Sequence, residues 1–286
     1  MTQDSWQVAR FRGRQQRFTV HAELPDGTAV RAHTNNTGRL TGCGEPGARC
    51  WLSPARRPGR KLAWTLEVME APAWPASRRE PPAAPAPVPL TAPAPAAGQV
   101  LVGVNTAAPG PLVSAAVTAG LLPDLAGCRL ERREVPYPPA IAPGSRADLL
   151  LRDRAGAPVW VEIKNVTWVR GGLALFPDAP TARGRKHLAD LARCVAAGEH
   201  AALVLCVQRG DAERVAAAAT IDPAYASALQ QAAAAGVRCL GLQIAVTPGG
   251  LRPLRPLPLI TDAPGGDGPS GDEPGGDEPL TREGPP

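Results

Sequence analysis

Three features that the sequence lacks narrow its function before any motif is considered. No apolar run approaches the ~20 residues that a membrane-spanning helix needs, and the polar, basic N-terminus has no apolar signal-peptide segment. The six cysteines are scattered, with no CxxC pair and no histidines at zinc-ligand spacing. We therefore expect a cytoplasmic protein without membrane contact, whose cysteines are reduced and mostly buried.

Lysine is also scarce, because Lys61, Lys164 and Lys186 are the three lysines among 31 basic residues. Where arginine is the usual cation, a lysine marks a place that needs a compact charge or an amine that exchanges protons. The scarcity therefore draws attention to Lys164 and Lys186, which both lie in the second half of the chain.

Glycine and proline are abundant, at 30 and 34 residues, and much of this excess lies in two segments. Residues 71–97 form a Pro/Ala tract and residues 262–286 form a Gly/Pro/acid-rich tail; neither has the apolar period of a packed element. We expect both to be disordered, which leaves two domains at residues 1–70 and 98–261. Because the Pro/Ala insert lies between two strand candidates, it is either a linker between the domains or a long loop of the first domain.

The charge of the chain is unevenly distributed. Residues 262–286 carry seven acids and one Arg, a net charge of −6, so the +5 of the whole chain leaves +11 on residues 1–261. A basic body with an acidic tail indicates a polyanion partner, with the tail competing for the same surface. The alternative is a tail that only improves solubility.

The first 70 residues contain short alternating strands and tight turns. RFTVHAEL and TAVRAHT flank a turn at Asp26-Gly27, which predicts a hairpin, and further strand candidates follow. The Gly/Asn-rich stretch NNTGRLTGCGEPG lets the backbone approach a ligand or a neighbour closely. A five-stranded oligonucleotide-binding (OB) barrel fits this pattern. Near its start, aromatic residues alternate with basic ones, which suits nucleic-acid binding as well as a solvated edge strand; the candidates are Arg10, Arg12, Arg14 and Arg17.

From residue 98 the pattern becomes mixed α/β. After a first strand, QVLVGVNT, the elements are expected in the order helix, three strands, helix, strand, followed by an additional helix and strand. HAALVLCVQ is almost continuously apolar, as expected of a strand that is buried on both faces. The helix before it is expected to begin after Thr181 as its N-cap and to stop at Gly198.

Two of these strands carry a set of charged residues. In VWVEIKNVT, Val161 and Ile163 share one face of an alternating strand, while Glu162 and Lys164 share the other. Asp148 lies in the preceding strand, so antiparallel pairing would bring the two carboxylates side by side. Such a pair becomes favourable when Mg²⁺ or Mn²⁺ bridges it, with Asp148 and Glu162 as ligands and Lys164 stabilising a phosphate. The alternative is a surface salt bridge on a solvated face, worth ~0–1 kcal/mol.

The helix after FPDAPT supports a phosphate-binding face. One of its stripes is basic and consists of Arg183, Lys186 and His187. A second stripe should pack on the sheet and consists of Leu188, Leu191 and Val195. Two more acids are candidates for supplementary metal ligands, although a structural role is the simpler interpretation for each: Glu134 and Asp178.

Five separated motifs occur in the order RQQRFTVHAELPDG, HTNNTGRLTGC, GSRADLLL, VEIKNVT and FPDAPTARGRKHL. In this order they resemble the sugar fermentation stimulation protein family of bacteria, over both domains but not over the insert or the tail. The resemblance implies an α+β two-domain fold, with an N-terminal OB-like barrel and a C-terminal α/β domain like that of PD-(D/E)xK nucleases.

The same resemblance assigns roles to individual residues. The nuclease-like catalytic motif falls on Asp148, Glu162 and Lys164. The Arg-x-x-Lys-His helix of the family falls on Arg183, Lys186 and His187. One departure is Ala147, which replaces the proline that precedes the motif aspartate.

Three functions are compatible with these observations. The +11 charge of residues 1–261, the barrel-like N-terminus and the basic helix favour a protein that binds DNA largely independently of sequence. The family resemblance implies DNA binding with a regulatory part in sugar metabolism. The intact Asp, Glu and Lys set favours a Mg²⁺-dependent nuclease that cleaves phosphodiesters. The Pro-rich tract is compatible with a protein-interaction adaptor, although such tracts more often serve as spacers.

The charge distribution generates a first prediction. Because phosphate contacts should dominate binding, affinity for DNA should fall steeply with salt and vary little with sequence. Deleting residues 262–286 removes a net charge of −6 and should therefore strengthen binding at low salt. Fluorescence anisotropy over a salt series measures both effects, and a salt-independent affinity would contradict the prediction.

Overall fold

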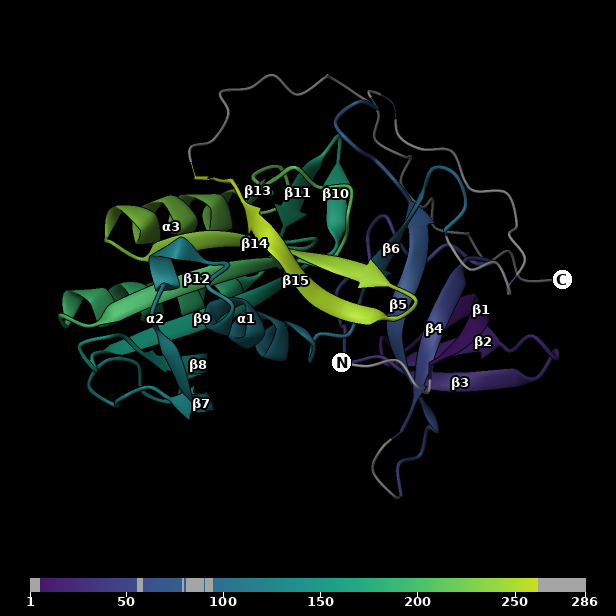
Figure 1. The fold of residues 1–286 in the computed structure, drawn as a ribbon, viewed down its shortest axis with the longest axis horizontal. Helices are drawn as coiled ribbons and strands as arrows, with labels where there is room; N and C mark the ends of the chain where they lie inside the picture. The colour runs from purple at the N-terminus through teal and green to yellow at the C-terminus, as the bar shows by residue number, and fades with distance from the viewer. Residues whose placement is uncertain (1–5, 56–58, 79, 81–89, 91–94, 262–286) are drawn as a thin grey trace, which may run out of the picture.

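The computed structural model describes residues 6–55, 59–78, 80, 90 and 95–261. They form an N-terminal barrel and a C-terminal three-layer unit that lie side by side (Figure 1). Most of the expected Pro/Ala insert and the whole expected tail, residues 262–286, lie outside the described residues. Within the described part of the chain, no helix has the length and apolar character that a membrane crossing requires.

The predicted OB barrel is confirmed. Its sheet has the order β3-β2-β1-β4-β5-β6, and a parallel contact between β3 and β5 closes five strands into a barrel. The predicted turn joins β2 to β3, with Gly27 at φ 85° and the Thr28 N–H donating to Asp26 Oδ1 at 2.9 Å. The strands are β1 (Gln7–Gln15), β2 (Thr19–Glu23), β3 (Ala29–His33), β4 (Arg49–Pro54), β5 (Trp64–Pro72) and β6 (Gln99–Gly103).

Strand β6 differs from the sequence expectation, which assigned it to the domain beginning at residue 98. It pairs antiparallel with β5, from Val68↔Gly103 to Pro72↔Gln99. The physical reason is an open edge, because β3 pairs only with the start of β5, at Trp64 and Thr65. The Pro/Ala insert thus connects two neighbouring strands of the barrel sheet, which is the loop alternative and not the linker.

The C-terminal unit is built on a six-stranded mixed sheet of order β15-β14-β12-β9-β8-β7. Its strands are β7 (Arg129–Pro136), β8 (Arg146–Arg152), β9 (Pro158–Val166), β12 (His200–Val207), β14 (Arg238–Thr247) and β15 (Gly250–Leu257). A smaller sheet consists of β10 (Trp168–Arg170), β11 (Leu173–Phe176), β13 (Arg214–Ala217) and β16 (Leu259–Ile260). As expected from its apolar run, β12 is central and pairs in parallel with both β9 and β14.

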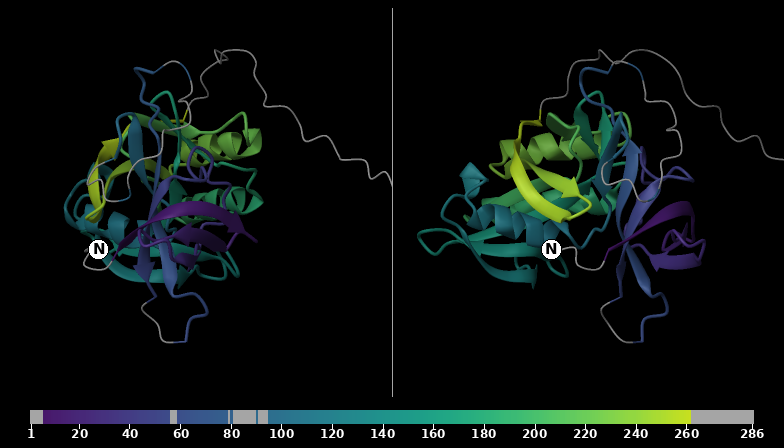
Figure 2. Two further views of the ribbon diagram at one scale, coloured as in Figure 1. Left: turned by 90° about the vertical axis from the view of Figure 1, so that its right-hand side faces the viewer. Right: turned by 45° about the vertical axis from the view of Figure 1, so that its right-hand side comes forward.

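Helices cover both faces of the large sheet (Figures 1 and 2). They are α1 (Pro109–Thr118), the short 3-10 helix η1 (Pro123–Leu125), α2 (Ala182–Ala196) and α3 (Pro223–Ala234). Helix α2 begins as predicted, because the Thr181 side chain accepts a hydrogen bond from the Gly184 N–H at 2.9 Å. It ends before Gly198, at φ 83°, and its predicted apolar stripe is buried through Leu188 and Leu191.

The barrel and the large sheet share one apolar cluster. Trp51, Val68 and Leu101 of the barrel belong to the same buried cluster as Val161 of β9 and Ile244 of β14. Polar contacts reinforce this junction: the Gly103 N–H donates to the Gln208 carbonyl at 2.9 Å, and Arg209 donates to Pro72 O at 3.1 Å. The two units are therefore fixed against each other, and the space between them has a defined shape.

A buried ion pair inside the barrel generates the second prediction. Arg49 and Glu70 make a two-pronged contact at 2.9 and 2.7 Å with side chains that are 1% and 5% exposed. Glu70→Ala removes the buried carboxylate from its contact with Arg49, so it should lower the free energy of unfolding by about 3–5 kcal/mol in urea titrations. The matched control is Glu23→Ala, which breaks the exposed pair with Arg12 and should cost less than about 1 kcal/mol. Equal losses would contradict the burial argument.

Candidate active site

Asp148 and Glu162 lie on neighbouring antiparallel strands, at the point where regular pairing ends. The β8–β9 ladder runs from Arg152↔Pro158 to Leu149↔Val161, and the two acids occupy the next position on each strand. There the Asp148 side chain takes the place of a backbone acceptor, because its Oδ2 accepts a hydrogen bond from the Ile163 N–H at 2.6 Å. The structure thus brings the two sequence-predicted carboxylates together at the end of the ladder.

Glu162 is the most deeply buried acid of the site, at 2% exposure. Its Oε1 accepts hydrogen bonds from Lys164 Nζ at 2.6 Å and from His187 Nδ1. Its Oε2 is buried and has no hydrogen-bond partner among the described residues. The contact with Lys164 is therefore a largely buried ion pair and not the solvated surface bridge that the sequence left open.

The pKa values of the two carboxyl groups are shifted in opposite directions. Burial raises the pKa of Asp148 to about 7, and the nearby negative charge of Glu162 adds to this, against the Ile163 N–H and Lys164. Burial also acts to raise the pKa of Glu162, but the hydrogen bond from His187 and the charge of Lys164 outweigh it, so its pKa is lowered. Near neutral pH, Glu162 is thus ionised while Asp148 is partly protonated.

The three residues of the basic stripe of α2 make two separate sets of contacts. Arg183 Nε donates to His187 Nε2 at 3.3 Å, so His187 carries its proton on Nδ1 and donates it to Glu162. Lys186 turns away from this chain of contacts, because its ammonium pairs with the buried Asp190 at 3.1 Å and donates to the Ser145 hydroxyl. Of the three predicted residues, His187 contacts the carboxylate of Glu162 directly and Arg183 contacts His187.

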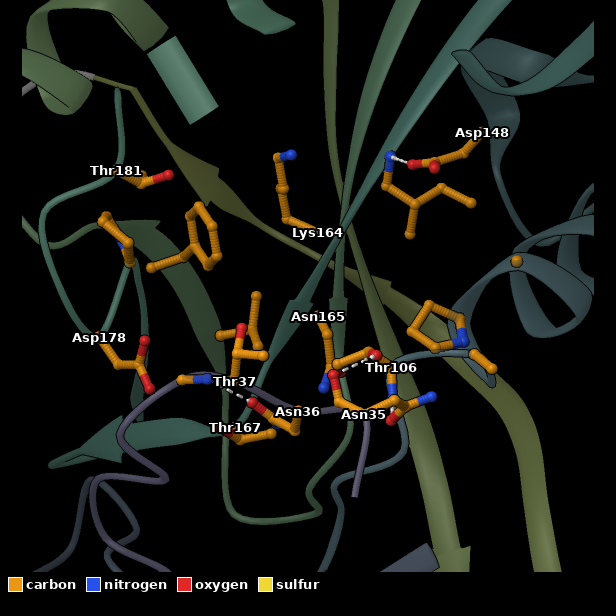
Figure 3. Close-up of a pocket in the computed structure, with 18 of the residues that line it drawn as sticks. Asn35, Asn36, Thr37, Thr106, Asp148, Lys164, Asn165, Thr167, Asp178 and Thr181 are labelled. Atoms are coloured by element: carbon orange, nitrogen blue, oxygen red, sulfur yellow. Dashed lines mark hydrogen bonds between the residues drawn. The ribbon is translucent and has the colours of Figure 1, made fainter. Parts of the chain in front are cut away.

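Two cavities meet at Asp148 and Lys164. The larger one, of about 700 Å³, lies between the barrel and the C-terminal unit (Figure 3). Figure 3 shows Asp148 and Lys164 on one side of this cavity and Asn35, Asn36 and Thr106 on the other. The smaller one, of about 510 Å³, includes Glu162 and the three basic-stripe residues of α2.

The barrel contributes a rigid loop to the larger cavity, residues 34–38. Arg14 holds it by donating to the carbonyls of Asn36 at 3.0 Å and Gly38 at 2.8 Å. Asn36 donates to Val104 O at 3.2 Å, and Asn35 donates to Asn105 Oδ1 at 2.8 Å. The sequence indicated that this Asn/Gly stretch approaches a ligand or neighbour, but only the fold reveals which neighbour.

Gly38 shows how close this approach is. A Cβ added there would lie 2.8 Å from Oδ2 of Asp178, in the loop before α2. Asp178, a candidate supplementary ligand, is therefore packed against the barrel loop. The second such candidate, Glu134, is an exposed residue of β7 at φ 51° that lines both cavities.

The four predicted arginines of the barrel do not form one free basic surface. Arg10 donates to Gly47 O at 2.9 Å, Arg12 pairs with Glu23 at 2.8 Å, and Arg14 holds the loop described above. Arg17 is exposed beside Phe18, a half-exposed ring that is stacked on His33 with centroids 6.4 Å apart. Contact between these arginines and nucleic acid stays a prediction.

The carboxylate cluster fits a divalent cation with few protein ligands. No group of three or more His, Cys, Asp or Glu side chains suited to a metal occurs within the described ranges. Mg²⁺, however, is usually bound by one or two carboxylates and keeps several waters. The unpaired Oε2 of Glu162 and the Asp148 carboxylate supply such a set, because an unpaired buried oxygen is costly unless a ligand satisfies it.

Comparison with known proteins places the chain in a family. The model of the SfsA N-terminal OB domain matches residues 13–75, and that of the sugar fermentation stimulation protein RE domain matches residues 107–250. A sugar fermentation stimulation protein homolog of Halorhodospira halophila is 44% identical over 88% of this chain and 94% of its own length. The chain belongs to the sugar fermentation stimulation protein (SfsA) family.

Other members of the SfsA family extend this comparison. A homolog from Rhodospirillum centenum is 44% identical over 83% of this chain and 90% of its own length. The SfsA structure of Pyrococcus furiosus, solved in complex with Ca²⁺, superposes with a TM-score of 0.73 at 23% identity. It covers 91% of this chain and 98% of that one, which confirms the SfsA fold over both domains.

The raised pKa of Asp148 generates the third prediction. A carboxyl whose pKa rises from 3.8 unfolded to about 7 folded makes the protein less stable as pH increases between these values. In EDTA, the stability gained by Asp148→Asn should therefore be larger at pH 8 than at pH 4.5, by about 1–3 kcal/mol. Thermal and urea unfolding at both pH values measure this.

The control for this prediction is Asp26→Asn. Asp26 has a lowered pKa because the Thr28 N–H donates to its carboxylate, so its replacement should bring no gain at high pH. A gain for Asp148→Asn that does not change with pH would show that repulsion by Glu162 and burial are not its cause.

Proposed function

We propose that this protein is a divalent-metal-dependent nuclease that binds DNA without strong sequence preference. One observation carries the proposal: Glu162, whose buried Oε2 has no hydrogen-bond partner among the described residues, lines the smaller cavity together with Asp148 and Lys164, which also line the larger one. Two carboxylates and a lysine in a cleft are the side chains that metal-assisted phosphodiester hydrolysis requires.

Asp148 and Glu162 are the residues that would hold the metal. Bound there, Mg²⁺ or Mn²⁺ would polarise a phosphate oxygen and offset negative charge in the transition state. Two observations support a hard divalent ion: both proposed ligands are carboxylates, and the Pyrococcus furiosus relative was solved in complex with Ca²⁺.

The neighbouring side chains have separate roles. Lys164 places a compact cation beside the carboxylates, where it can stabilise charge that develops on a reacting phosphate. His187 orients Glu162 through its Nδ1–H, and Arg183 fixes that tautomer of His187 from the other side. Lys186, held by Asp190, leaves its half-exposed side chain at the smaller cavity, where it can contact a phosphate.

A second candidate function is DNA binding without cleavage, as part of the regulation of sugar metabolism. The observation that favours it is the name shared by the family members, sugar fermentation stimulation protein. The +11 charge of residues 1–261 and the OB barrel support nucleic-acid binding in either case. The two candidates differ in whether the bound DNA is cleaved.

Substitution of the site residues generates the fourth prediction. Lys164→Ala should leave Mg²⁺ binding by calorimetry within about twofold but reduce cleavage of supercoiled and single-stranded DNA by about 10²–10³-fold. Glu162→Gln should abolish both Mg²⁺ binding and cleavage, because a neutral amide is a poor ligand for a hard cation. The matched control is Lys61→Ala, an exposed lysine of the barrel, which should retain full activity.

The outcomes separate the two candidates. DNA binding by the wild-type protein without cleavage in Mg²⁺ or Mn²⁺ would leave the regulator and exclude the nuclease. Absence of divalent-ion binding at millimolar concentration would contradict the metal site itself.

A further inference from the structure

The larger cavity has a wall that the proposed reaction does not use. Asn35 and Thr37 from the barrel, and Asn165 and Thr167 at the end of β9, line this wall together with Trp168. None of these five residues carries a charge, and they come from both domains.

The two cavities differ in charge around the same central residues. Both include Glu134, Asp148, Lys164 and Arg183, and the smaller cavity adds Glu162, Arg146 and the remaining basic-stripe residues of α2. Among the described residues, the charged groups that line only the larger cavity are Arg133 and Asp178. Asp148 and Lys164 therefore lie between a side with a small excess of basic groups and a side whose additional charges, Arg133 and Asp178, are of opposite sign.

A nucleotide has the same division, with a charged phosphate on one side and a neutral base on the other. Side-chain amides both donate and accept, as the edges of bases do, and an indole ring offers a face for stacking. The volume of about 700 Å³ lies within the ~300–1,000 Å³ of small-molecule sites. The larger cavity thus has the size, and its neutral wall the chemistry, to bind a nucleobase.

The wall is held by hydrogen bonds within the protein, and one of its buried donors has no partner among the described residues. Arg14, Asn35 and Asn36 fix the barrel loop through the hydrogen bonds described above, so binding orders no additional backbone there. Asn165 accepts from Gln208 Nε2 at 2.6 Å, whereas its own Nδ2 is buried without a partner in the described part of the chain. A buried donor in this state favours a ligand that accepts a hydrogen bond.

We propose that the larger cavity binds one unpaired nucleobase of the strand whose phosphate lies at Asp148 and Lys164. A base can present its edge to this wall only when it has left its stack and its pair. The preferred substrate class is therefore single-stranded nucleic acid or an unpaired strand end, in preference to an intact duplex. This inference rests on the proposed function, since it assumes that a phosphate occupies the carboxylate site.

The test is an abasic scan of a single-stranded oligonucleotide of about 12 nucleotides. The full chain is titrated by anisotropy in Ca²⁺, with a single abasic position moved along the strand. One position should weaken binding by about 5- to 100-fold, because one base loses its stacking and hydrogen bonds, while the other positions have small effects. The paired duplex of the same sequence should bind more weakly than the single strand.

A variant that fills the larger cavity tests whether the base at the sensitive position binds there. Thr37 is exposed at the cavity, so Thr37→Trp should weaken binding of the intact strand by a similar factor and abolish the loss at the sensitive abasic position. Thr28→Trp, at the exposed β2–β3 turn of the same barrel, is the matched control and should retain both properties. Thermal unfolding verifies that both variants are folded, and the scan of the wild-type chain is independent of any variant.

The outcomes distinguish this inference from the function on which it rests. Salt-dependent binding that tolerates an abasic site at every position would overturn the nucleobase site and leave the nuclease proposal intact. Duplex binding as tight as single-strand binding, or an abasic loss that persists in Thr37→Trp, would also overturn it. A wild-type chain that binds no nucleic acid would overturn both proposals.

Discussion

The apolar cluster shared by the barrel and the large sheet is the constraint on which the remaining architecture depends. Trp51, Val68 and Leu101 pack into the same buried cluster as residues of β9 and β14, so the two domains have one core where they meet. Because that contact fixes their relative position, the loop at residues 34–38 is held over the end of β9. The cleft is thus a product of interdomain packing, and neither domain contains it alone.

The carboxylate site lowers the free energy of unfolding of the metal-free chain, and packing elsewhere must offset this loss. Glu162 is almost fully buried, and one of its two oxygens is paired with Lys164 and His187 while the other is unpaired among the residues described. Burial, together with the negative charge of Glu162, raises the pKa of Asp148 to about 7. Burial of this kind opposes folding of the metal-free chain and favours a ligand that supplies positive charge.

Much of the fold was predictable from the sequence, since the signals are local. The Asp26-Gly27 turn, the Thr181 cap and the apolar run of β12 each follow from a few neighbouring residues, and the charge set on β8 and β9 follows from strand alternation. The pairing of β6 with β5 was not predictable, because it depends on an edge that β3 leaves open. The contact of Arg14 with the Asn36 carbonyl was not predictable either. The sequence pattern around an arginine on a strand does not distinguish one that binds a phosphate from one that binds a backbone carbonyl.

The connection between β5 and β6 has a consequence for how this chain tolerates change. Both of its ends are pinned by the barrel: the Ala73 N–H donates to Gly98 O at 2.8 Å, and the Ala96 N–H donates to Glu70 Oε1 at 3.2 Å. The entropy of closing a loop grows only with the logarithm of its length, so doubling the segment costs about 0.6 kcal/mol. A longer segment between these two hydrogen-bonded ends would therefore add little to the entropy cost of folding, and an epitope inserted there is expected to leave both end contacts in place.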